Sequence, residues 1–256
     1  MFLQIKYSTE IAKELGKIAV YLPGEIIEVG DIIKFPYGKA GFLKKEAPLG
    51  TFTKISSLKN LDVNYSEDDS LGNKHSYKFS SKNSVKSITS ANSQIEVVDE
   101  LPNANGEIKL QFTSEGSIYF HAIECYKKQI GDISKLENEI ISKSKVLIWD
   151  NTYLVTSVTY ASNALIMQSR SKNSEITLAG NINGLKTQGI DIGVSAELNI
   201  KNQNGDFFIK DWSQNVSVFM ELMKFEKETF QVINKNFSPK ESKDRLIPVQ
   251  INSLII

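Results

Sequence analysis

The stretch GIDIGVSAELNIKN, from Gly189 to Asn202, alternates apolar and polar residues along most of its length. The apolar residues are Ile190, Ile192, Val194, Ala196, Leu198 and Ile200. A β-strand sends alternate side chains to opposite faces, so this pattern predicts a strand with one apolar and one polar face. The apolar face would either pack on a protein core or contact lipid. The other segments of the chain help to distinguish these two possibilities.

The preceding segment, SEITLAGNI (Ser174 to Ile182), supplies a partner for that strand. Its apolar face carries Ile176, Leu178 and Ile182, and the sequence NGLKTQG that follows is suited to a turn. The two arms form a predicted hairpin of roughly 9 to 11 residues per arm, longer than the mean strand of about 5 to 6 residues. A tilted strand of about that length crosses a bilayer. An ordinary soluble sheet shows the same alternation, so the pattern alone leaves both readings open.

Other segments predict an α+β fold, with a twisted, mostly antiparallel β-sheet and a few peripheral helices. Helical spacing at Ile11, Leu15 and Ile18 predicts a short helix that begins near Ser8 or Thr9. GDISKLENEIISKSK predicts a second helix, with Ser134 and Glu137 as a capping box.

Three further segments read as strands or loops. Residues 106–126 alternate twice and predict a hairpin that turns near Glu115 and Gly116. Residues 66–94 are rich in Ser, Asn and Lys and predict a long mobile hairpin or loop. VSVFMELMKF, starting at Val216, predicts a strand.

The composition restricts the class of protein. The 256 residues include 30 Lys plus Arg and 30 Asp plus Glu, which argues against a dedicated nucleic-acid binder. The single cysteine, Cys125, excludes an internal disulfide and suits a reducing compartment. Charged residues interrupt the N-terminus where a signal peptide needs an apolar run, and no run approaches the ~18 apolar residues of a transmembrane helix. We therefore expect the inactive chain to be cytoplasmic.

The sequence contains no recognisable catalytic constellation. It has no Gly-rich phosphate loop and no GxSxG motif, and His75 and His121 are its only histidines. His121 and Cys125 would share one face of a strand, but a zinc site needs three or four ligands and no third is evident nearby. A nucleophile and its base would converge from separate loops instead of lying in one strand. We expect neither an enzyme nor a metal or cofactor.

The C-terminal segment changes character twice. NKNFSPKESKDR (Asn234 to Arg245) is charged and contains Pro239, which predicts an exposed linker. An apolar segment follows a solvated linker, and such a segment gains about 1.5–3 kcal/mol for each well-buried side chain when it docks. Its apolar residues are Leu246, Ile247, Val249, Ile251, Leu254, Ile255 and Ile256.

At this point the layout of the chain resembles that of the bacterial gasdermins. WDNTYLVTSVTYASNALIMQSRS (Trp149 to Ser171) is similar to the strand pair that follows a short helix in that family. The likeness includes the pattern of an aromatic residue followed by Val-Thr, at Tyr153, Val155 and Thr156. The polar hairpin, the final strand VSVFMELMKF and the short tail come in the family's order, and IAVYLPGEIIEVGDII is similar to its N-terminal helix, proline and first strands. The resemblance covers nearly the full chain.

The resemblance implies a pore-forming immune effector held inactive by its C-terminal peptide. Residues 1–235 would be the pore-forming domain, 236–245 an exposed cleavable linker and 246–256 the apolar autoinhibitory peptide. The resting protein would be a monomer. A partner protease would cut before the tail, and the freed body would then bind lipids of the inner (plasma) membrane. There it would oligomerise into a β-barrel pore that kills the cell in anti-phage defence. Candidate residues at the cut are Asn236, Lys240, Lys243, Asp244 and Arg245.

Two regions would then enter the membrane. The second hairpin is residues 174–202, whose lipid-facing residues would be the apolar rows given above. The first falls within residues 61–98. Many subunits are needed, because a lone hairpin has unpaired backbone edges that lipid cannot satisfy. Lys6, Lys13 and Lys17 are candidates for contact with lipid headgroups, although they also fit a solvated helix face.

Alternatives remain open from the sequence. Some bacterial gasdermins carry a lipidated N-terminal cysteine, and this sequence has none near residue 1. The main alternative is a soluble β-rich binding or scaffold protein whose apolar tail is a permanent structural clasp. A hydrolase with an unrecognised site is a more remote one.

Overall fold

The computed structural model describes residues 3–21, 25–35, 39–40, 45–46, 51–89, 92–97, 105–142, 152–181, 199–210, 215–229 and 242–249. It confirms the α+β class and the mostly antiparallel sheet, and every described strand pair is antiparallel. The helical elements are α1 (Leu3–Leu15), α2 (Ile133–Ser142) and the short 3-10 turn η1 (Lys59–Leu61). The strands are β1 (Ile18–Ala19), β2 (Asp31–Lys34), β3 (Lys39–Ala40), β4 (Lys45–Glu46), β5 (Thr53–Ser57), β6 (Glu67–Ser80), β7 (Val85–Thr89), β8 (Asn92–Val97), β9 (Asn105–Phe112), β10 (Ile118–Ile130), β11 (Tyr153–Ala161), β12 (Asn163–Ser169), β13 (Ser174–Asn181), β14 (Asn199–Asn204), β15 (Phe207–Lys210), β16 (Val216–Thr229) and β17 (Ser242–Pro248).

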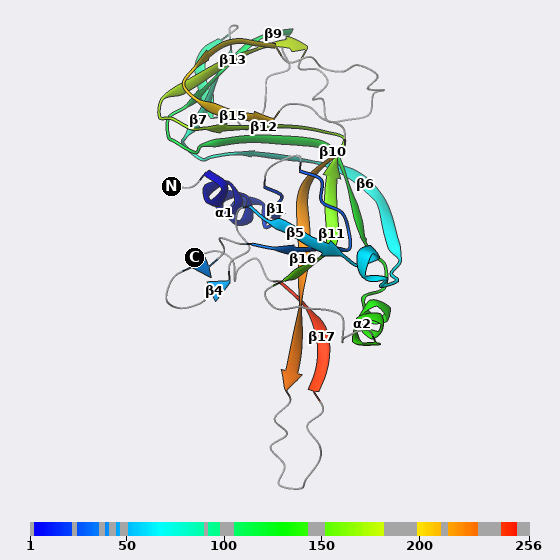
Figure 1. Ribbon diagram of the computed structural model, residues 1–256. Coiled ribbons are helices and arrows are strands. Elements are labelled where there is room, and N and C mark those ends of the chain that lie inside the picture. Colours follow the sequence, from blue (N-terminus) through cyan, green and yellow to red (C-terminus); the bar gives the residue numbers. More distant parts are fainter. Residues whose placement is uncertain are drawn as a thin grey trace.

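Two sheets form most of the fold (Figure 1). The larger one, the body sheet, has ten strands in the order β1-β16-β11-β10-β12-β15, with β6 on β10, β17 on β16, β2 on β11, and β5 on β2. The smaller one, the folded-back sheet, has the order β14-β13-β9-β7-β8. In Figure 1 the folded-back sheet lies above β12 and β15, so the molecule is two-layered at this end.

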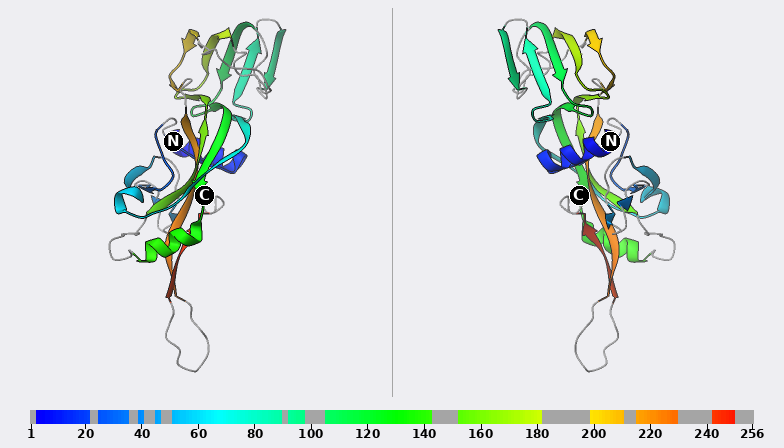
Figure 2. Two further views of the ribbon diagram at one scale, coloured as in Figure 1. Left: turned by 90° about the vertical axis from the view of Figure 1, so that its right-hand side faces the viewer. Right: turned by 90° about the vertical axis from the view of Figure 1, so that its left-hand side faces the viewer.

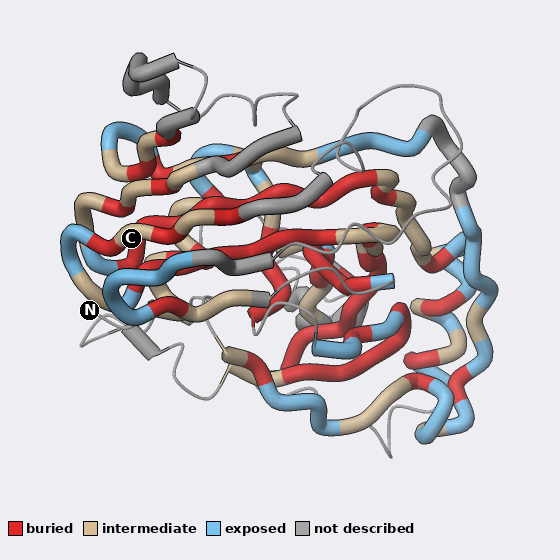
Figure 3. The backbone as a smooth tube through the Cα atoms, turned by 90° about the horizontal axis from the view of Figure 1, so that it is seen from above, coloured by how far each residue is buried: buried red, intermediate tan, exposed pale blue. Residues whose placement is uncertain are grey.

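The buried apolar side chains form three groups. One lies between the two sheets and includes Leu110, Phe112, Tyr119 and Ile176. The second lies under α1, and the third lies between β11, β16 and α2. Figure 3 shows buried residues concentrated along the central strands and exposed ones at the turns. Strands with two buried faces therefore pack between layers instead of showing clean alternation.

Both helices differ from the sequence prediction at their starts. Helix α1 begins at Leu3, so Ser8 and Thr9 lie inside it, and Ile18 belongs to β1. Gly16, with a φ of 61°, ends the helix and donates its N–H to the Ala12 carbonyl. In α2 the cap is Asp132, whose side chain accepts the N–H of Lys135 at 2.9 Å, in place of the expected Ser134.

The predicted hairpin at residues 106–126 is wrong. Strand β9 pairs with β7 and β13 in the folded-back sheet, whereas β10 pairs with β6, β11 and β12 in the body sheet. Alternation correctly gave two strands, but it shows which face a side chain occupies and does not show which strand lies beside it. Residues 66–94, which were expected to form a long mobile hairpin or loop, contain β6, a strand of 14 residues that pairs with β10.

The final described elements form a long two-stranded ribbon (Figure 2). β17 pairs with β16 from Met223 opposite Pro248 to Thr229 opposite Ser242. Residues 242–245, which were expected in an exposed linker, therefore form the first half of a strand. The start of the predicted linker, residues 236–241, lies outside the described residues.

Candidate functional site: the crease between the two sheets

Four strands of the body sheet continue, each through a short bend, into four strands of the folded-back sheet. β6 leads into β7, β9 into β10, β12 into β13, and β14 into β15. The neighbour order is the same on both sides: β6-β10-β12-β15 in one sheet and β7-β9-β13-β14 in the other. The two layers are thus one four-stranded sheet folded over on itself. We call the bends at residues 81–84, 113–117, 170–173 and 205–206 the crease.

The pairing register continues through the centre of the crease. Ile118 pairs with Gln168 in the body sheet, and Phe112 pairs with Ser174 in the folded-back sheet. Moving six residues back along one strand corresponds to six residues forward along the other, so no register change separates the two layers. The N–H of Gly116 donates to the Ser169 carbonyl at 2.7 Å and extends the ladder into the bend. The outer strand pairs differ by two or three residues at their bends.

Each bend contains a residue with a left-handed backbone. These are Asn83 (φ 59°), Gly116 (φ 76°), Asn173 (φ 53°) and Gly205 (φ 98°). Glycine and asparagine adopt this region at the lowest cost, so the residue types match the geometry. The tetrapeptide Ser-Lys-Asn-Ser occurs twice, at residues 81–84 and 171–174, and forms two of the four bends. This repeat is the signal that sequence reasoning missed.

Serine side chains satisfy the backbone groups that the bends leave without ladder partners. The Ser81 hydroxyl accepts the N–H of Ile118 at 2.9 Å, and the Ser171 hydroxyl accepts the N–H of Asp206 at 3.1 Å. The hydroxyls of Ser117 and Ser169 both donate to the Ser114 carbonyl, at 2.7 and 2.8 Å. These hydrogen bonds are local to the bends and add to the apolar packing between the two sheets.

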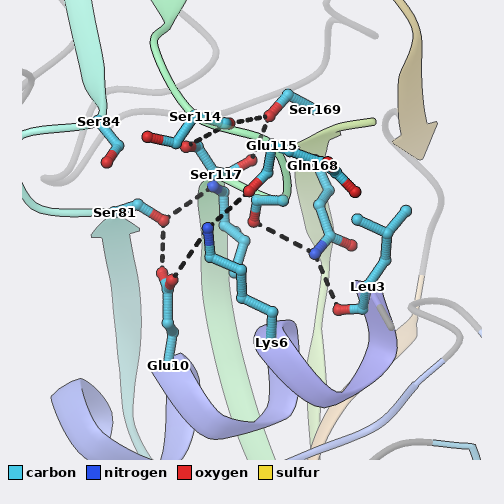
Figure 4. Close-up of polar contacts among 12 residues, drawn as sticks. Leu3, Lys6, Glu10, Ser81, Ser84, Ser114, Glu115, Ser117, Gln168 and Ser169 are labelled. Atoms are coloured by element: carbon cyan, nitrogen blue, oxygen red, sulfur yellow. Dashed lines mark hydrogen bonds and ion pairs between the residues drawn. The ribbon is translucent and has the colours of Figure 1, made fainter. Parts of the chain in front are cut away.

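Helix α1 lies against the crease and makes polar contacts with it (Figure 4). The Lys6 ammonium donates to the Glu115 carbonyl at 2.7 Å and lies 3.8 Å from the Glu10 carboxylate. Glu10 in turn accepts a short hydrogen bond from the Ser81 hydroxyl. Gln168 donates its amide N–H to the Leu3 carbonyl at 2.9 Å. Three segments of the crease region are therefore connected to one helix.

His121 lies between the two sheets, on the same face of β10 as the buried Tyr119 and Ile123. Both ring nitrogens of this fully buried histidine lack a hydrogen-bond partner among the described residues. Burial, with a smaller contribution from the Lys78 ammonium, lowers the pKa of His121 from 6.5 to about 4. The imidazole is therefore neutral at pH 7 and charges only in acid.

His121 and Cys125 do not share a face, in contrast to the sequence expectation. Glu124 has a φ of 49° and sits at a break in the β6–β10 register, so an extra residue shifts the alternation. Cys125 consequently packs with Phe120 and Ala122 under α1, on the face of β10 opposite to His121. Burial also raises the pKa of the Cys125 thiol to about 12. The two residues form neither a metal pair nor a nucleophile with its base.

The predicted membrane hairpin is described in part. β13 and β14 pair antiparallel, with Leu178 opposite Ile200. Ile176 and Leu178 are buried in the core between the two sheets, so in this state their apolar face rests on protein. The remaining predicted positions, Ile182, Ile190, Ile192, Val194, Ala196 and Leu198, lie outside the described residues.

The described part of the predicted tail docks on the body. Leu246 is 5% exposed and packs in the same core as Leu136 and Ile140 of α2. Its N–H donates to the Glu137 carboxylate at 2.7 Å, and the N–H of Val249 donates to the Leu222 carbonyl at 2.9 Å. Ile247 pairs with Lys224. Ile251, Leu254, Ile255 and Ile256 lie outside the described residues.

The other predicted site residues lie apart from each other. Asn236 and Lys240 are not among the described residues, whereas Lys243, Asp244 and Arg245 pair with Glu228, Lys227 and Glu226 in β17 and β16. Of the three lysines proposed for lipid contact, Lys6 is engaged at the crease, Lys13 is exposed, and the Lys17 ammonium lies 6.0 Å from the ring centre of Tyr77. Each therefore has a different local environment.

Two features are absent from the residues that the structure describes. None of the helices in this part of the chain has the length and apolar character needed to cross a membrane. Within the same residues, no three His, Cys, Asp or Glu side chains gather closely enough to hold a metal ion.

Comparisons with known proteins show a likeness to solved structures only at low sequence identity. No family model matches the chain, and no curated protein matches it. Among solved structures, it is similar to the cryo-EM structure of the Gasdermin A3 membrane pore, at 9% identity over 94% of this chain and 100% of that chain. The TM-score of that match is 0.32, which is a weak likeness in fold.

Proposed function

We propose that the protein is an autoinhibited pore-forming effector of the gasdermin type. In this proposal, proteolysis before the C-terminal tail frees a body that binds the cytoplasmic face of the plasma membrane, oligomerises and opens a pore, which kills the cell in defence against phage. The observation that carries the proposal is the crease, where neighbour order is kept and the central register continues. Straightening four bends would convert the two layers into one long sheet of four strands.

The two faces of the folded-back sheet suit a membrane wall. Its inner face carries Leu110, Phe112, Ile176 and Leu178, which are now covered by the body sheet. After opening, lipid would replace the body sheet around these side chains. They would remain shielded from water, so the favourable free energy of their burial would be kept.

Polar side chains lie on the opposite face of the folded-back sheet. Lys109 pairs with Glu175 at 2.6 Å, and Gln111 donates to the same carboxylate at 2.7 Å. Such a row suits a water-filled lumen. Because lipid cannot satisfy unpaired backbone edges, the strands of many subunits would have to pair into a closed wall.

The tail is the proposed brake. Leu246 holds β17 on α2, and β17 in turn covers one edge of β16. A cut at Asn236 or Lys240 would leave β17 held by noncovalent contacts alone, and loss of the tether lowers its effective concentration. A cut at Lys243, Asp244 or Arg245 is less favourable, because these residues are paired with β16. They would have to separate from β16 before a protease could bind them as a single extended chain.

Dye release from liposomes tests this function. The full chain, carrying a site for a sequence-specific protease within residues 236–241, is mixed with dye-loaded liposomes that contain phosphatidylglycerol. We expect release only after cutting, and we expect none from the cut Val194→Asp variant, because a charge would then face lipid. Cut wild-type protein that stays monomeric and releases no dye over several lipid mixtures would refute the proposal.

One observation favours a second function. Leu246 is buried as deeply as an ordinary core residue, which is what a permanent clasp in a soluble binding or scaffold protein requires. In that case cutting would leave β17 in place or would precipitate the protein, with no damage to the liposomes.

A further inference from the structure

We infer that α1 is a latch that holds the crease closed, and that α1 must leave the crease before the folded-back sheet can open. This inference rests on the proposed function for its biological meaning. The physical claim, that α1 restrains the bends, concerns the resting protein alone. Three sets of contacts carry it.

The first set joins α1 to the bend between β9 and β10. The Lys6 ammonium donates to the Glu115 carbonyl at 2.7 Å. The next residue, Gly116, has a φ of 76°, and a Cβ added there would lie 2.7 Å from Cδ of Lys6. The aliphatic part of the Lys6 side chain thus packs directly on a left-handed glycine, at the point where the chain passes from β9 of one sheet to β10 of the other.

The second set joins α1 to the bend between β6 and β7. Glu10 accepts from the Ser81 hydroxyl, and the same hydroxyl accepts the N–H of Ile118 at 2.9 Å. One turn further along the helix, Glu14 pairs with the Lys82 ammonium at 2.8 Å. Ser81 and Lys82 are the first two residues of the bend, so both carboxylates hold it from the same side.

The third set fixes the start of the helix. The Leu3 carbonyl accepts the side-chain N–H of Gln168, which also approaches the Gly116 carbonyl at 3.4 Å. Gln168 lies on β12, two residues before the third bend. The two ends of α1 are therefore tied to different strands of the crease region.

Apolar packing places the helix on the back of the same strands. Tyr7 and Ile11 are buried against Ile118, Phe120 and Ile166 of β10 and β12. This packing involves the body sheet and can survive opening. The polar contacts with Glu115, Ser81 and Lys82 involve bend residues, whose backbone changes when the bends straighten, so these contacts must break.

Hydrogen exchange in the uncut, full-length protein tests the restraint directly. Lys6→Met keeps the apolar stem and removes the bond to Glu115, and Lys13→Met is the matched control, because Lys13 lies on the same helix but is exposed. We expect about tenfold faster exchange of the bend N–H groups of Ser81, Gly116 and Ile118 in Lys6→Met, and no change in Lys13→Met. Equal exchange in Lys6→Met and wild type would overturn the latch, whether or not the protein forms pores.

A reversible crosslink tests whether release of α1 is required. Glu14→Cys and Lys82→Cys are joined by a short bifunctional thiol reagent that a reductant cleaves, and Cys125 is too deeply buried to compete. We expect the cut, crosslinked protein to release liposome dye at least about tenfold more slowly than the same protein after reduction. Equal release before and after reduction would refute the latch. If the reduced and wild-type proteins both stay silent, the pore proposal fails, and hydrogen exchange alone decides the restraint.

Discussion

The substitution Leu246→Ala should weaken the docking of strand β17 in the uncut protein. The side chain is 5% exposed and packs in one core with Leu136 and Ile140 of α2. Replacing a buried Leu by Ala costs roughly 2–5 kcal/mol, and we expect about 3 kcal/mol here because β17 lies at an edge and the site can partly close. Since each 1.4 kcal/mol changes an equilibrium tenfold, the population with β17 undocked should rise about 100-fold.

Amide hydrogen exchange measures that population. In Leu246→Ala, the N–H groups of Leu246 and Val249 should exchange about 100-fold faster than in wild type, and uncut protein should begin to release liposome dye. Ile141→Ala is the matched control, because Ile141 is 39% exposed on the same helix and should change stability by less than about 0.5 kcal/mol. Wild-type exchange rates at β17 in Leu246→Ala would show that burial of this side chain does not hold the strand.

Three further substitutions test the fold. The lowered pKa of His121 means that the unfolded chain binds a proton below pH 6.5 and the native chain only near pH 4. Stability should therefore fall as the pH drops through that window, by up to about 3 kcal/mol, and His121→Leu should flatten the fall in a urea titration. Gly30→Ala should lower the melting temperature strongly, since φ is 86° and the new Cβ would lie 2.6 Å from the Tyr65 hydroxyl, whereas Gly16→Ala, with open space, should cost only about 1 kcal/mol. Lys54→Met should cost about 1–3 kcal/mol in chemical denaturation, because it leaves the buried Asp31 without its 2.7 Å ion pair, while Lys74→Met breaks only an exposed pair.

Hydrophobic periodicity predicted elements whose two faces meet different surroundings. α2 and β13 were found because each carries an apolar stripe or row that packs on one side, whereas β16 was found although both of its faces are buried from Val216 to Met220. The start of α1 was missed because Leu3 has no Ser, Thr, Asp or Asn cap before it in the sequence. The local hydrophobic pattern is therefore enough to predict that a helix or strand exists. It does not predict where a helix begins when no capping residue marks the start.

The crease was not predictable from alternation. Gly116 was read as a hairpin turn, and Asn and Gly favour hairpin turns and inter-layer bends for the same backbone reason. The bulge at Glu124 has no compositional signal, because glutamate rarely adopts a positive φ and tertiary packing imposes it here. Which sheet a strand joins is a long-range property that single-strand patterns do not encode.

The unbroken central register also makes the protein sensitive to the parity of insertions. Side chains alternate between the two faces of a strand with a period of two. One residue added to the bend at 113–117 would therefore exchange the two faces of β9 relative to those of β10. Two added residues would restore the match, at the cost of a longer bend. The lengths of the inner bends should therefore vary in steps of two among functional variants of this chain. In a library of insertions, variants with one added residue should lose function and variants with two added residues should keep it.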